Sequence, residues 1–180
     1  MTSSRAARPV VLIGLMASGK STVGRLLAAR LGCPFIDNDV ALEERTGRSA
    51  REIAAQDGAD ALHTLEAETL VDALGPPEPA VIAAAAAAAV DPKVESALRG
   101  RDVVYLRAAP EVLAARIEHE TDDGHRPFVV DDPARVLAEQ FAARDARYRE
   151  LATLIVDAGD DDPERVVDAI MDGLRSAPAR

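Results

Sequence analysis

Cysteine, aromatic side chains and positive charge are all scarce in this chain of 180 residues. The single cysteine, Cys33, excludes an internal disulfide framework and a four-cysteine zinc site. Acidic residues outnumber lysine and arginine by 31 to 21, which gives a formal net charge of −10. This balance argues against a nucleic-acid-binding protein or a protein of anionic membrane surfaces, because both need a positively charged face.

Long hydrophobic runs are missing as well. The longest apolar block, 80–90, is mostly alanine and too short to cross a bilayer. The basic segment 1–8 is not followed by an apolar run of signal-peptide length. We therefore expect a soluble, cytoplasmic protein without membrane contacts, and we expect a monomer. The length and the apolar fraction of 48% predict one domain over 1–180 with a sizeable core.

Short apolar runs alternate with segments of helical periodicity. The runs predict five strands, at 10–13, 35–36, 80–82, 103–106 and 153–156. The periodic segments predict helices at 20–31, 40–45, 50–55, 59–74, 110–118, 133–151 and 163–174. This alternation indicates an α/β fold, a three-layer sandwich around a mostly parallel sheet.

A phosphate-binding sequence lies between the first predicted strand and the first predicted helix. The segment Gly14–Ser21, GLMASGKS, matches G-x-x-x-x-G-K-[ST] without a mismatch. Glycines let the backbone N–H groups turn toward a phosphate, and the helix N-terminus adds the positive end of its dipole. We expect Lys20 to contact the β- and γ-phosphates of ATP and the Ser21 hydroxyl to ligate Mg²⁺. The predicted nucleotide-binding residues are Gly14, Ala17, Ser18, Gly19, Lys20, Ser21 and Thr22.

Two aspartates, Asp37 and Asp39, follow the second predicted strand. In extended chain their carboxylates point to the same side, at the sheet edge where ligands of parallel α/β proteins gather. One carboxylate could hold a water molecule of Mg²⁺, and the other could accept the proton of an acceptor hydroxyl. A solvated turn that caps the next helix through Asp39 is the structural alternative.

From Val10 to Leu174 the sequence resembles the shikimate kinase family of small P-loop kinases. Besides the phosphate loop, the resemblance rests on Asp37-Asn38-Asp39, Thr46–Ile53, His125-Arg126-Pro127-Phe128, and Arg144 four residues before Tyr148. It implies a P-loop NTPase-type fold with a five-stranded parallel sheet in the order 2-3-1-4-5. It also implies an acceptor-binding helical section at about 40–75 and a lid at about 119–132.

The resemblance further implies a role for each matching residue. Asp39 would take the acceptor hydroxyl, Asp37 would support Mg²⁺, and Arg126 would neutralise charge on the transferring phosphoryl group. Arg144 would pair with the substrate carboxylate, and Arg116 would lie near the nucleotide. The residues themselves leave alternatives open: Arg126 could balance acidic neighbours on the surface, and Arg144 could join a helical network with Glu139 or Gln140.

Two departures from the family pattern fall in the acceptor pocket. The family usually carries a Phe-Arg pair whose arginine grips the substrate carboxylate, and here the aligned residues are Leu62 and His63. A glycine run that lines the pocket is replaced by Ala85-Ala86-Ala87, which would be strained by about 1 kcal/mol or more wherever a positive φ is needed. We still expect His63 and Ala86 to face the substrate; the alternative for His63 is a solvated or core-edge residue on the helix face of Glu66. Whether the alanine tract is strand, loop or helix stays open.

We therefore predict an enzyme that transfers a phosphoryl group from ATP to a hydroxyl of a small polar metabolite. Shikimate, converted to shikimate 3-phosphate, is the leading acceptor. The alternatives are a related kinase for another hydroxylated metabolite and a non-catalytic nucleotide-binding module that regulates a partner.

Overall fold

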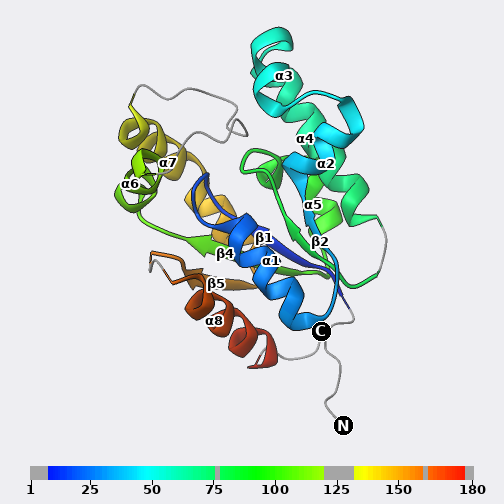
Figure 1. Ribbon diagram of the computed structural model, residues 1–180, viewed down its shortest axis with the longest axis vertical. Coiled ribbons are helices and arrows are strands. Elements are labelled where there is room, and N and C mark those ends of the chain that lie inside the picture. The colour runs from blue at the N-terminus through cyan, green and yellow to red at the C-terminus, as the bar shows by residue number, and fades with distance from the viewer. Residues whose placement is uncertain (1–7, 76–77, 120–131, 160–161, 177–180) are drawn as a thin grey trace.

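The computed structural model describes residues 8–75, 78–119, 132–159 and 162–176 (Figure 1). The strands are β1 (Val10–Ile13), β2 (Phe35–Asp37), β3 (Val81–Ala83), β4 (Asp102–Arg107) and β5 (Leu154–Asp157). The helices are α1 (Lys20–Leu31), α2 (Asn38–Thr46), α3 (Ala50–Asp57), α4 (Ala59–Leu74), α5 (Pro92–Leu98), α6 (Pro110–His119), α7 (Pro133–Leu151) and α8 (Pro163–Ser176). A short 3₁₀ turn, η1 (Ala88–Val90), follows β3.

The five strands form one sheet in the order β2-β3-β1-β4-β5, and every neighbouring pair is parallel. This confirms the predicted strand order. The central strand β1 is wholly buried, which explains its uninterrupted run of Val and Ile/Leu side chains. Because the strands are parallel, the carboxyl ends of β1, β2 and β3 meet at one edge. The phosphate loop, the acidic pair and the alanine tract therefore lie together at that edge.

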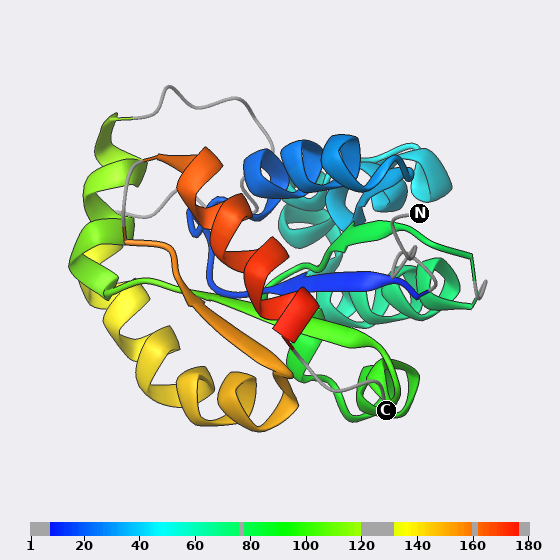
Figure 2. The same cartoon turned by 90° about the horizontal axis from the view of Figure 1, so that it is seen from below.

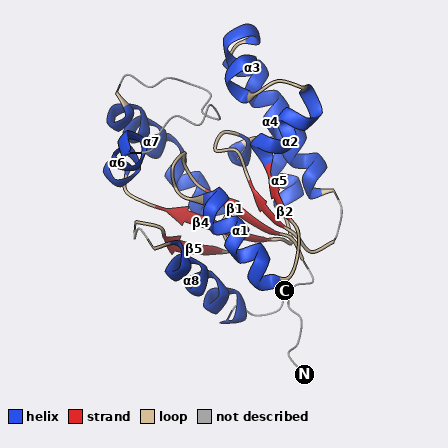
Figure 3. Cartoon of the chain, in the orientation of Figure 1, coloured by secondary structure: helices blue, strands red, loops and turns tan. Residues whose placement is uncertain are grey.

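Helices cover both faces of the sheet, as the predicted sandwich requires (Figures 2 and 3). Alternate residues of β4 point to opposite sides: Val103 and Tyr105 join one core cluster, and Val104 and Leu106 join the other. The first cluster takes apolar side chains from α4, α5, α6 and α7. The second takes them from α1 and α8.

The segment from α2 to α4 has a small core of its own, made by Leu42, Ala50, Ile53 and Leu62. A capping box begins α3, where Ser49 and Glu52 bond each other's backbone N–H groups. Within the described parts of the chain, no helix is both long and apolar enough to span a membrane.

The predicted helices at 59–74 and 133–151 have the observed bounds, whereas α5 was missed. Its signal is the Asp91-Pro92 pair: the Asp91 carboxylate accepts from Lys93 N at 2.7 Å, and proline holds the first helical position. The alanine tract, left open above, ends β3, forms a loop and then enters η1. Ala17 is the one non-glycine residue of the described chain with a positive φ, so the alanines at 85–87 carry no such strain.

Candidate active site

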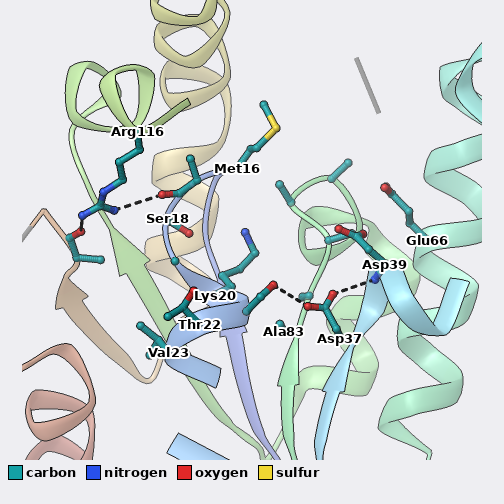
Figure 4. A pocket seen from close by; sticks show the side chains of 18 of the residues that line it. Met16, Ser18, Lys20, Thr22, Val23, Asp37, Asp39, Glu66, Ala83 and Arg116 are labelled. Atoms are coloured by element: carbon teal, nitrogen blue, oxygen red, sulfur yellow. Dashed lines mark hydrogen bonds between the residues drawn. The ribbon is translucent and has the colours of Figure 1, made fainter. Parts of the chain in front are cut away.

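A cavity of about 580 Å³ opens at the carboxyl edge of the sheet. Figure 4 shows Arg116 on one side of it and Glu66 on the other, with Lys20, Asp37 and Asp39 between them. Its wall contains these predicted site residues: Ala17, Ser18, Gly19, Lys20, Ser21, Thr22, Asp37, Asp39, His63, Ala86, Arg116 and Arg144. The predicted residue Arg126 and most of the predicted lid fall outside the described residues.

Gly14 does not line the cavity; it packs against β4 at the start of the phosphate loop. A Cβ at this position would lie 2.7 Å from the Leu106 carbonyl oxygen, and the backbone has a φ of 149°. Only glycine fits so close to β4, and this contact sets where the phosphate loop leaves β1. Gly19, with a φ of 87°, precedes α1 and offers no side-chain cap. The first N–H groups of α1 therefore remain available to an anion in the cavity.

Lys20 bends back over the phosphate loop. Its Nζ donates to the carbonyl oxygens of Gly14 at 3.0 Å and Leu15 at 2.9 Å. Burial lowers the pKa of Lys20 to about 8, and the negative charges of Asp39, Asp37 and Glu66 oppose that shift. The side chain is thus a partly desolvated cation, which makes its attraction to a bound polyphosphate strong.

Asp37 carries out two tasks at once. Its Oδ2 accepts from the Ser21 hydroxyl at 2.6 Å, and its Oδ1 accepts from the Asp39 N–H at 3.2 Å. The second bond makes Asp37 the N-cap of α2. The structural alternative, in which Asp39 caps this helix, is therefore wrong in its choice of residue. The Ser21 hydroxyl and the Asp37 carboxylate form an oxygen pair of the kind that Mg²⁺ prefers.

Asp39 and Glu66 bring two carboxyl groups to the same end of the cavity (Figure 4). Glu66 is only 6% exposed, and Asn38 Nδ2 donates to its backbone carbonyl at 3.2 Å, which ties α2 to α4. Burial and the neighbouring charge of Asp39 raise the pKa of Glu66 to about 8, against the opposing charges of Arg144 and Lys20. Sequence reasoning noted Glu66 only as a helical neighbour of His63. A strongly shifted carboxyl group in a cleft marks it as a site candidate.

His63 on α4 and Arg144 on α7 both reach the cavity. Of the alternative partners on α7, Glu139 pairs with Arg135 at 2.8 Å, and no ion pair between Glu139 and Arg144 is found among the described residues. Gln140, the other proposed partner, lines the cavity itself. Arg144 lines the same cavity as Glu66, and its positive charge acts on Glu66 and on Tyr148.

Arg116, on α6, joins two loops at the opposite end. Its guanidinium donates to the Ala17 carbonyl at 3.2 Å and to the Ala158 carbonyl at 2.8 Å. Ala17 belongs to the phosphate loop and has a φ of 61°, a conformation that an alanine rarely adopts. Arg116 thus stabilises this turn of the phosphate loop and connects it to the segment after β5.

Comparisons with known proteins agree with this geometry. The family model for shikimate kinase matches residues 16–175, a range that contains the whole cavity wall. A shikimate kinase of Paramagnetospirillum magneticum is 37% identical over 97% of this chain and 88% of its own length. Shikimate kinase from Acinetobacter baumannii, solved in complex with shikimate, has a TM-score of 0.80 at 29% identity and covers 92% of this chain and 93% of its own. A gluconokinase from Sinorhizobium meliloti has a TM-score of 0.69 at 25% identity, with 95% and 93% of the two chains covered.

Proposed function

The chain belongs to the shikimate kinase family, and we propose that it transfers the γ-phosphoryl group of ATP to the 3-hydroxyl group of shikimate. The observation that carries this proposal is that the two ends of the cavity are lined by different sets of residues. One end is built from the phosphate loop and Arg116, and the other from His63, Glu66 and Arg144. Asp39 lies between Lys20 and Glu66 (Figure 4), and its negative charge acts on both groups.

We assign the nucleotide to the phosphate-loop end. The N–H groups at the start of α1 and the Lys20 ammonium would contact the β- and γ-phosphates. Arg116 would flank the nucleotide while it keeps the loop at Ala17 in place. Ser21 and Asp37 would hold Mg²⁺, either directly or through water, and their 2.6 Å contact supports this pairing. The bound ion would supply positive charge that stabilises the polyphosphate.

Asp39 is the proposed general base. Its carboxylate accepts the proton of the acceptor hydroxyl while that oxygen forms a bond to the γ-phosphorus. The bond from this phosphorus to the oxygen bridging the β-phosphate breaks, and ADP leaves. Lys20 stabilises the charge that develops on the transferring group, and we propose that Arg126 adds a second positive charge.

The acceptor section, about 40–75, would bind the substrate together with Arg144. In this proposal the Arg144 guanidinium pairs with the substrate carboxylate, and His63 and the backbone at Ala86 contact the ring substituents. We also propose a monomeric, single-domain enzyme of the cytoplasm.

A coupled assay of ADP release tests the proposal. We expect turnover that depends on shikimate, and we expect Asp39→Asn to lower it about 100-fold or more while ADP binding is retained. Asp60→Asn is the matched control, because Asp60 is an exposed acid in the same helical section.

The same assay with different acceptors distinguishes the alternative functions. Absence of turnover with millimolar shikimate would refute the proposal. Turnover with gluconate alone would favour a kinase for another hydroxylated metabolite. ATP binding that no small acceptor changes would favour a regulatory module instead.

A further inference from the structure

A buried tyrosine joins the acceptor end of the cavity to α7. Tyr148 is 0% exposed, and its Oη donates to the Ala86 carbonyl oxygen at 2.6 Å. Ala86 belongs to the loop that follows β3 and lines the cavity. Burial raises the pKa of Tyr148 to about 12, so its hydroxyl keeps the proton that it donates. The bond therefore orients the peptide between Ala86 and Ala87, because a trans peptide is planar.

The same tyrosine acts on Arg144, the cavity cation of α7. Residues 144 and 148 are one helical turn apart and share a face of α7. The positive charge of Arg144 acts on the Tyr148 hydroxyl and opposes the pKa shift that burial causes. Tyr148 thus bonds the alanine loop and lies one turn of α7 from Arg144, so it adjoins two parts of the acceptor end that come from distant segments of the chain.

A second anchor fixes α7 without touching this loop. The Tyr105 ring packs on the Tyr148 ring with centroids 5.1 Å apart, and Tyr105 Oη donates to Asp145 at 2.9 Å. Arg107 Nε and Arg149 Nε donate to the same carboxylate at 3.0 and 2.7 Å. The contacts from Tyr105 and Arg107 hold the helix against β4, whereas the Tyr148 hydroxyl holds it against the alanine loop.

We infer that Tyr148 is a positioning residue for the acceptor: its hydroxyl sets the spacing between the Arg144 guanidinium and the Ala86 backbone, between which the substrate is held. The inference rests on the proposed function of this cavity. Its reason is the 2.6 Å bond itself, which joins the alanine loop to α7 across 62 residues of sequence. A small displacement of either part would weaken acceptor binding and leave the nucleotide end unchanged.

Tyr148→Phe removes the hydroxyl and keeps the buried ring. We expect the KM for shikimate to rise about threefold to tenfold, in line with the loss of one hydrogen bond, while the KM for ATP stays within about twofold. Tyr105→Phe is the matched control: it removes the hydroxyl from the other buried ring of the same pair, and both KM values should stay within about twofold. Melting temperatures of both variants separate a general loss of stability from a local change.

Three outcomes would overturn the inference: an unchanged shikimate KM in Tyr148→Phe, an equal change in Tyr105→Phe, or a joint rise of both KM values. A double-mutant cycle with Arg144→Lys gives a second test. If the two residues act as a unit, the combined loss in kcat/KM should fall short of the product of the single losses by about twofold or more, and purely multiplicative losses would contradict the idea. A wild-type chain without shikimate turnover would instead refute the proposed function, so the two failures are distinguishable.

Discussion

Replacement of Glu66 by glutamine should stabilise the protein in a pH-dependent way. The carboxyl group is buried, and its pKa rises from 4.5 to about 8. Since the folded state binds this proton more tightly than the unfolded chain, the stability that the proton supplies is complete below pH 4.5 and is lost as the pH rises toward 8. At about 1.4 kcal/mol per pK unit, the protonation of Glu66 that folding requires costs the wild type about 3 kcal/mol at pH 7.

Urea unfolding at pH 5, 6, 7 and 8 measures this cost. Glu66→Gln should gain less than about 1 kcal/mol over the wild type at pH 5 and up to about 3 kcal/mol at pH 7. Glu68→Gln is the control on the same helix, because Glu68 is 44% exposed and its surface ion pair with Arg45 contributes little. A stability difference that does not grow between pH 5 and pH 8 would refute the assignment of a buried, protonated carboxyl group.

Two further substitutions test the ends of the cavity separately. His63→Arg should lower the KM for shikimate about tenfold, because a bidentate guanidinium would meet the carboxylate; His63→Lys should give a smaller gain, and equal gains from both would contradict the reasoning. Asp37→Asn keeps an oxygen that can accept from the Asp39 N–H but loses the charge beside Ser21. The Mg²⁺ concentration for half-maximal activity should therefore rise about tenfold or more with an almost unchanged melting temperature, and an unaltered Mg²⁺ dependence would remove Asp37 from the metal site.

Local sequence signals were enough for the elements and for the phosphate end of the cavity. The phosphate loop is a continuous segment whose glycines, lysine and serine act within a few residues of each other, so its spacing alone is informative. Proline at the first position of α5, α6, α7 and α8 marks each of these helix starts, although the 7-residue α5 escaped notice. The strand order came from the resemblance to a family and not from periodicity, which carries no information on which strands pair.

The acceptor end could be predicted only in part, because its properties depend on contacts between distant segments. Glu66 reads as an ordinary helical glutamate until α2 brings Asp39 beside it. The capping role of Asp37 required the actual turn, since either aspartate of the triplet could serve from sequence alone. Tyr148 is 62 residues from the carbonyl that it contacts, and nothing in the spacing of the chain indicates that bond.

The histidine at position 63 and the raised pKa of Glu66 are connected. An arginine at position 63 would be a nearby countercharge for Glu66, and histidine in its place lacks the permanent charge and the bidentate fork. The opposing positive charges on Glu66 come instead from Arg144 and Lys20. In the proposed reaction, Arg144 binds the substrate carboxylate and Lys20 binds the phosphates. When those anions bind, they compete with Glu66 for the two cations, so the carboxyl group holds its proton more tightly in the substrate complex than in the free enzyme. A protonated Glu66 can then donate a hydrogen bond to a hydroxylated acceptor, and it adds no negative charge beside Asp39.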